Sequence, residues 1–161
     1  MGEMIKVGMA DLKICISPNA VTTLGLGSCV GVAIRDPQTK VGGLAHVMLP
    51  NSKAVNNNSN VAKFADTGVV ELVRQMEKAG AVRRRMVAKI AGGAQMFALQ
   101  SKSELMQVGR RNVEAVKEVL KELGISILSE DTGLDYGRTV EFYPETGDYV
   151  IKSVGKPVKT I

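Results

Sequence analysis

Short runs of valine, isoleucine and other apolar residues, each closed by glycine, proline or asparagine, recur along the whole sequence. Runs of this kind are typical of short β-strands separated by tight turns. Glycine makes up 17 of the 161 residues, which is about 11% against roughly 7% in average proteins. The pattern therefore predicts a mixed domain dominated by short strands, and it disfavours a helical bundle.

The turn residues divide the chain into expected strands and two expected helices. The strands are expected at residues 4–9, 12–16, 21–24, 29–35, 40–49, 86–94 and 125–130, with a C-terminal hairpin around 145–148. Helices are expected at 66–79 and 109–123, where apolar residues recur at helical spacing. Asp66 or Thr67 is expected to cap the first helix. No domain boundary or repeat is visible, so we expect one α+β domain over residues 1–161.

The basic charge of the chain is modest. The net charge is +5 and the pI is near 9.3. The only dense basic run, Arg83–Arg85, directly precedes an expected strand and has no interleaved aromatic residues. We interpret this run as a solvated junction between a helix and a strand, and we expect no nucleic-acid partner. A basic RNA-binding domain is the weaker alternative.

The sequence also limits the compartment and the cofactors. Residues 1–13 lack the apolar core of a signal peptide, and no run approaches 18 apolar residues. We therefore expect a cytoplasmic protein that does not insert into a membrane and that keeps Cys15 and Cys29 reduced. One histidine and two separated cysteines do not make a usual zinc site, and no complete phosphate- or dinucleotide-binding motif is present. We expect neither a metal nor a cofactor.

The chemistry is expected at Cys29 and His46, the only histidine. A four-residue turn at 36–39 would place Arg35 opposite Lys40 in a hairpin, and Cys29 would then lie directly opposite His46. Directly opposed residues of an antiparallel pair share a face, with Cβ atoms about 5 Å apart. An imidazole beside a thiol is the arrangement that nucleophilic catalysis requires, because the thiolate is the attacking species.

The segment before Cys29 suits the same chemistry. Its glycines make the backbone permissive, and Gly27 and Ser28 are candidates for supporting an oxyanion or the loop. Thr22 or Thr23 lies on a neighbouring segment and is a candidate for orienting the imidazole. The alternative is that Cys29 and His46 are ordinary core residues, as we expect for Cys15.

Six separate blocks then give the sequence a wider resemblance. They are TLGLGSCV (23–30), AHVMLP (45–50), ADTGV (65–69), KIAGGAQMF (89–97), VGRRNV (108–113) and EDTG…GRTVEF (130–142). Together and in this order they resemble the CheD family, the chemoreceptor glutamine deamidases of chemotaxis. The blocks extend over nearly the whole chain, so the resemblance is far more specific than one short motif.

The resemblance implies a Cys–His–Thr triad, with Cys29 as nucleophile, His46 as base and Thr23 as third member. It also implies a three-layer α/β/α sandwich with mostly antiparallel sheets and a catalytic core similar to that of the cytotoxic necrotizing factor toxins. The implied reaction is the hydrolysis of specific glutamine side chains, on the cytoplasmic domains of methyl-accepting chemotaxis receptors, to glutamate and ammonia.

A CheC-type phosphatase, bound and stimulated by this chain, is the second partner that the resemblance implies. The alternative function is that the chain acts mainly as a regulatory binding module for such a phosphatase. The polar segment 51–60 and the segment 92–97, which includes Phe97, are candidates for the docking rim.

Overall fold

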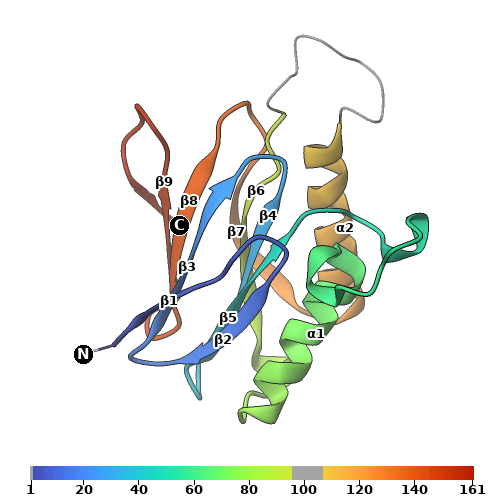
Figure 1. Cartoon of the computed structure of the whole chain (residues 1–161). Helices are drawn as coiled ribbons and strands as arrows, with labels where there is room; N and C mark the ends of the chain where they lie inside the picture. Colours follow the sequence, from blue (N-terminus) through green and yellow to red (C-terminus); the bar gives the residue numbers. More distant parts are fainter. Residues whose placement is uncertain (1, 96–106) are drawn as a thin grey trace.

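The computed structural model describes residues 2–95 and 107–161, which form two five-stranded sheets and a layer of helices (Figure 1). Sheet A contains, in spatial order, β1 (Met4–Lys6), β3 (Ala20–Leu26), β8 (Arg138–Tyr143), β9 (Asp148–Lys152) and β10 (Lys159–Thr160). Sheet B contains β2 (Leu12–Ile16), β5 (Val41–Val47), β4 (Val30–Asp36), β6 (Val87–Gly92) and β7 (Ser126–Thr132). The α-helices are α1 (Ala65–Lys78) and α2 (Val108–Glu122), and the short 3-10 helices are η1 (Ser52–Ala54), η2 (Val61–Lys63) and η3 (Arg83–Arg85).

Most neighbouring strands run antiparallel, and only the pairs β1–β3 and β6–β7 are parallel within the described residues. The α+β class and the mostly antiparallel sheets are therefore confirmed. The chain changes sheet repeatedly at its start, because β1 and β3 belong to sheet A whereas β2, β4 and β5 belong to sheet B.

The order of the layers corrects the expected α/β/α sandwich. Both α1 and α2 cover the same face of sheet B, where Leu72 and Leu120 pack with Val32. Sheet A covers the other face, where Phe142 of β8 packs with Leu44 of β5. The layers of the described residues thus run helices, sheet B, sheet A (Figure 1).

The burial of the strands explains this order. Every residue of β5 is buried, so sheet B must be covered on both faces. In β8, buried and partly buried residues alternate, so sheet A buries only one face completely. A sheet of that kind is stable without a second helix layer.

A β-bulge in β3 was not predicted from the sequence. We expected a loop from Gly25, but β3 continues to Leu26, and the pairing with β8 shifts between Thr23 and Leu26. Gly25 takes a φ of +68°, which suits glycine. The extra residue places Thr23 and Leu26 on the same buried face, although three positions separate them in the sequence.

The expected cap of α1 is wrong. Phe64 occupies the N-cap position and its side chain forms no capping hydrogen bond. Asp66 instead accepts hydrogen bonds from the N–H and the hydroxyl of Ser52, at 3.0 and 2.7 Å. Thr67 donates its hydroxyl to the carbonyl of Val61 at 2.7 Å. These bonds attach the segment that follows β5 to the start of the helix.

The Arg83–Arg85 run forms η3 between α1 and β6, which confirms the predicted helix–strand junction. Arg85 is its partly buried member and pairs with Asp36 at the end of β4. No helix in the described ranges is long and apolar enough to cross a membrane. The predicted docking residue Phe97 lies outside the described residues.

Candidate active site

Three chain segments bring Thr23, Cys29 and His46 into the space between the two sheets. Thr23 lies on β3 of sheet A, and His46 lies on β5 of sheet B. Cys29 lies on the short connection by which the chain crosses from β3 to β4. Thr23 and His46 are completely buried and Cys29 is 8% exposed. The site therefore exists only when the two sheets are packed together.

His46 faces sheet A rather than the helices. Its neighbours Ala45 and Val47 belong to the core cluster on the helix side of sheet B, whereas Leu44 belongs to the cluster between the sheets. Since side chains alternate along a strand, His46 shares the inter-sheet face with Leu44. Cys29 belongs to that inter-sheet cluster as well.

The predicted hairpin register is wrong by two residues. The turn occupies 37–40 instead of 36–39, and His46 lies opposite Gly31, not opposite Cys29. A shift of two residues keeps every side chain on its face, whereas a shift of one would have moved His46 to the helix side. Cys29 is therefore a diagonal neighbour of His46 across the hairpin, at a distance that longer side chains span.

The hydrogen bonds of Thr23 determine which nitrogen of His46 carries the proton. The Thr23 hydroxyl lies 2.7 Å from the Val7 carbonyl and 2.7 Å from Nδ1 of His46. The carbonyl only accepts, so the single hydroxyl hydrogen is donated to Val7. Nδ1 must then be the donor to the hydroxyl oxygen. In the neutral imidazole this leaves Nε2 unprotonated.

The free nitrogen of His46 is therefore a base. Nε2 is buried and has no hydrogen-bond partner among the described residues. Burial lowers the pKa of His46, because the charged imidazolium is poorly solvated inside the protein. His46 is thus neutral at pH 7 and able to accept a proton. The expected role of Thr23, rather than Thr22, fits this geometry, since the Thr22 hydroxyl donates to Val140.

The two cysteines differ in their surroundings. Burial raises the pKa of the Cys29 thiol, but a hydrogen bond from its own backbone N–H opposes the rise. Burial raises the pKa of Cys15 to about 11, and the Cys15 thiol donates to the Asn19 carbonyl. A thiol with a raised pKa is weakly reactive at neutral pH unless a base takes its proton.

The backbone before β4 is held from the loop that follows β6. The N–H of Gly93 donates to the Cys29 carbonyl at 2.8 Å, and the N–H of Ala94 donates to the Gly27 carbonyl at 2.9 Å. Gly92 has a φ of +110°, and a Cβ at this position would collide with the Cys29 carbonyl. The loop after β6 therefore holds the backbone on both sides of Ser28, next to the thiol.

Comparison with known proteins gives the same family as the six sequence blocks. The family model described as CheD chemotactic sensory transduction matches residues 48–153. A probable chemoreceptor glutamine deamidase CheD of Lachnoclostridium phytofermentans is 62% identical over 161 residues, which is 100% of both chains. The chain belongs to the CheD family.

Two further CheD relatives are similar over almost their full length. A probable chemoreceptor glutamine deamidase CheD of Caldanaerobacter subterraneus subsp. tengcongensis is 54% identical over 159 residues, covering 99% of this chain and 98% of the relative. The chemoreceptor glutamine deamidase CheD of Halalkalibacterium halodurans is 49% identical over 162 residues, covering 100% of both chains. The segment with Thr23, Cys29 and His46 precedes the range of the family model, but these full-length relatives extend over it.

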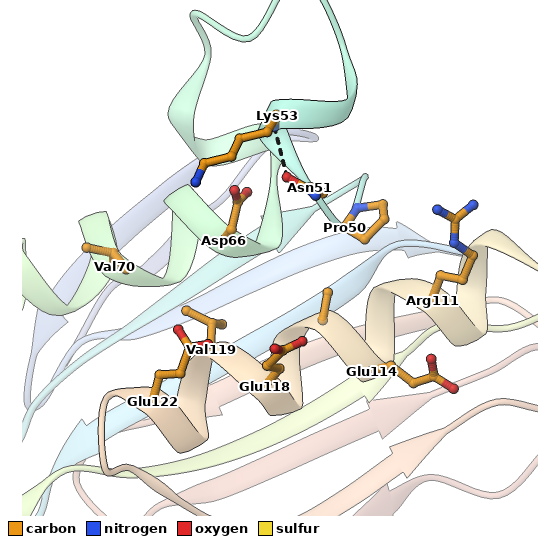
Figure 2. Close-up of a pocket in the computed structure, with 11 residues that line it drawn as sticks. Pro50, Asn51, Lys53, Asp66, Val70, Arg111, Glu114, Glu118, Val119 and Glu122 are labelled. Carbon is orange, nitrogen blue, oxygen red and sulfur yellow. Dashed lines mark hydrogen bonds between the residues drawn. The ribbon is translucent and has the colours of Figure 1, made fainter.

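The chain also has a groove on its outer helix layer (Figure 2). It has a volume of about 560 Å³ and lies between α1, α2 and the segment after β5. Asp66, Glu114, Glu118 and Glu122 give it an acidic lining, and Lys53 and Arg111 are its basic residues. Since α1 and α2 pack on the face of sheet B opposite His46, this groove is separate from the site at Cys29.

Gly27 and Ser28 are the residues predicted to support an oxyanion or the loop before Cys29, and no metal site is expected. The Gly27 N–H donates to the Gly25 carbonyl at 3.0 Å, so in this structure the group supports the loop. Ser28 is half-buried and directly precedes Cys29. Within residues 2–95 and 107–161, no group of three or more His, Cys, Asp or Glu side chains is placed to hold a metal ion.

Proposed function

We propose that this chain is a cysteine-dependent protein-glutamine deamidase that converts specific glutamine side chains of chemoreceptors to glutamate. The observation that carries the proposal is the Thr23–His46 hydrogen bond, which leaves Nε2 of His46 as a free base on the inter-sheet side of sheet B, where Cys29 also lies. The names of the full-length relatives supply the substrate class. Because the receptor domains in question are cytoplasmic, the proposed reaction takes place in the cytoplasm.

The first half of the reaction forms a thioester. Nε2 of His46 takes the proton of the Cys29 thiol while Sγ attacks the Cδ atom of the glutamine amide. The amide oxygen becomes an oxyanion. When the tetrahedral intermediate collapses, the C–N bond breaks and the proton on Nε2 passes to the leaving nitrogen, so that ammonia departs.

The second half releases the glutamate. A water molecule gives a proton to Nε2 of His46 and attacks the thioester carbon. The C–S bond then breaks, glutamate is formed, and the Cys29 thiolate recovers the proton from the imidazolium. Burial raises the pKa of Cys29 and lowers that of His46, so the resting pair is neutral and the proton moves only during attack.

Mass spectrometry of a chemoreceptor cytoplasmic fragment tests the proposal. Incubation with the wild-type protein should raise the mass by about one unit at each modified glutamine. Brief treatment with iodoacetamide should label Cys29 before Cys15, because only Cys29 has a base nearby. The mass gain should disappear in proportion to the Cys29 label. Equal labelling rates, or deamidation by fully alkylated protein, would contradict the proposed nucleophile.

The role of Thr23 gives a second expected outcome. Thr23→Val keeps the shape of the side chain but removes the acceptor for Nδ1–H, so His46 loses its fixed tautomer and orientation. We expect kcat for deamidation to fall roughly 100-fold with KM little changed.

Two matched variants control for the Thr23 substitution. Thr23→Ser retains the hydroxyl and should recover most of the activity. Thr22→Val makes the same change at the neighbouring residue, whose hydroxyl bonds to Val140, and should leave kcat nearly unchanged. A Thr23→Val protein as active as Thr22→Val would show that the tautomer argument is wrong.

A CheC-type phosphatase is proposed as a second partner, on the resemblance of the sequence blocks. Cys29→Ala separates binding from catalysis, because it removes the thiol and leaves the surface almost unchanged. If the chain acts mainly as a binding module, this variant should still capture and stimulate the phosphatase. Loss of chemotactic adaptation in the same variant would assign adaptation to the deamidase activity.

A further inference from the structure

Asn112 of α2 is a buried polar residue on an otherwise apolar helix face. Its exposed fraction is 0%, and it shares its face with Val116 and Val119, which belong to the core on sheet B. Its Nδ2 donates one hydrogen bond to the carbonyl of Ser28 at 2.9 Å and a second to the carbonyl of Met48 at 2.8 Å. Both hydrogens of this amide nitrogen are therefore used.

These two carbonyls belong to the segments next to the two reactive groups, just before β4 and just after β5. Ser28 immediately precedes Cys29, and Met48 follows His46 by two residues. One side chain from α2 thus connects the backbone beside the nucleophile with the backbone beside the base. In the sequence, Asn112 is 84 residues from Ser28 and 64 residues from Met48. The connection therefore forms only when α2 packs in its place against sheet B.

The Ser28 contact also determines the direction of an N–H group. The Ser28 carbonyl and the Cys29 N–H belong to one peptide unit, which is trans and planar. Holding the carbonyl toward α2 therefore turns the Cys29 N–H in the opposite direction, away from the helix layer. Helix α2 packs on one face of sheet B, and the Cys29 side chain belongs to the cluster on the other face, so the Cys29 N–H is turned toward the side of the thiol.

The carbonyls on either side are fixed as well. Ala94 N–H holds the Gly27 carbonyl, and Gly93 N–H holds the Cys29 carbonyl. Three consecutive carbonyls are thus bonded to the protein interior, and the middle one depends on a side chain. An N–H held in advance toward a developing oxyanion lowers the barrier, because it needs no reorientation during the reaction.

We infer that Asn112 is a positioning residue for the deamidation: by holding the Ser28 carbonyl, it aims the Cys29 N–H at the oxyanion of the tetrahedral intermediate. This inference rests on the proposed deamidase function. Asn112 touches neither the substrate nor the thiol, and it acts through the peptide unit that joins Ser28 to Cys29.

The helix that carries Asn112 packs closely against the loop after β6, next to Cys29. Gly109 of α2 packs directly on the loop after β6, and a Cβ at Gly109 would lie 2.6 Å from the Gly93 carbonyl. A Cβ at Gly93 would in turn lie 2.9 Å from the Gly109 carbonyl. Glycines on both sides permit this close approach, which puts Asn112 within reach of the strand ends.

The test compares two reactions of the same thiol in Asn112→Ala. Deamidation of a receptor fragment requires an oxyanion donor, whereas alkylation by iodoacetamide requires the thiolate alone. We expect kcat for deamidation to fall about 100-fold with KM within about threefold, because a small misplacement of a reacting group has effects of this size. The alkylation rate of Cys29 should stay within about threefold of wild type.

Val116→Ala is the matched control, since it removes buried volume from the same helix without touching Ser28 or Met48. Asn112→Leu keeps the volume and removes both donors, so it replaces Asn112→Ala if the latter unfolds, as judged by circular dichroism. Equal losses of deamidation and alkylation, or kcat unchanged in a folded variant, would overturn the inference. A wild-type protein without deamidase activity would overturn the proposed function first, and the inference with it.

Discussion

Cys29→Ala is expected to abolish glutamine deamidation, with kcat reduced by at least about 10³-fold, because no other group in the site can form the thioester. The fold should survive the change. Cys29 lies in the core between the sheets, but its neighbouring peptides are held by backbone bonds from Gly93 and Ala94. Loss of one sulfur atom should cost only about 1 kcal/mol of stability. Mass spectrometry of a receptor fragment, with circular dichroism of the variant, measures both effects.

Cys15→Ala is the matched control for this experiment. Cys15 is as deeply buried as Cys29 and belongs to the same inter-sheet cluster. Cys15 lies on β2 opposite Gly42 of β5, and Gly42 is separated from His46 along that strand. We expect full deamidase activity in Cys15→Ala. Deamidation that persists in Cys29→Ala, or that disappears equally in both variants, would show that Cys29 is not the nucleophile.

The hairpin of β4 and β5 illustrates how far the sequence alone determines the site. The alternation of side chains and a turn near Pro37 predicted that Cys29 and His46 share a face, and the structure agrees. The register was wrong, because the turn begins one residue later than expected and Lys40 takes a φ of +59°. A lysine in this conformation is uncommon, and no local signal identifies it.

Other features depend on contacts between segments that are distant in the sequence. The bulge after Thr23 is set by the pairing of β3 with β8, more than 100 residues later. The common face of α1 and α2 follows from the burial of sheet B on both sides, which the strand patterns did not reveal. Asn112 carries one local signal, because it is a polar residue at an apolar position of an amphipathic helix.

The second large effect is expected from Asp36, at the end of β4. Its carboxylate is completely buried and pairs with Arg85, with Nη2 2.8 Å from Oδ2. It also accepts from the N–H groups of Val82 and Gln38, both at 2.9 Å. One carboxylate thus joins the β4–β5 turn to the junction between α1 and β6. Asp36→Ala leaves a guanidinium and two N–H groups without this partner.

We expect Asp36→Ala to lower the free energy of unfolding by about 3 kcal/mol, since breaking a buried ion pair leaves its partners unsatisfied. For a chain of this size the melting temperature should fall by about 10 °C. Glu77→Ala is the matched control, because Glu77 forms an exposed ion pair with Arg83 in the same run. Exposed pairs contribute little. Equal stabilities of the two variants in urea unfolding would refute the structural role of Asp36.

The contribution of the Asp36 charge should also depend on pH. Burial alone would raise the pKa of this carboxyl, but the hydrogen bonds from Arg85, Val82 and Gln38 hold it well below its usual range. A group whose pKa is lower in the folded state stabilises the fold above its unfolded value, near pH 4, and loses that contribution as the pH falls. Asp36→Asn removes the charge and keeps the shape. The stability difference between wild type and Asp36→Asn should therefore be largest at pH 7 and should shrink as the pH is lowered below about 4. A difference that stays constant between pH 7 and pH 3 would mean that the charge of Asp36 contributes nothing beyond its hydrogen-bonding shape.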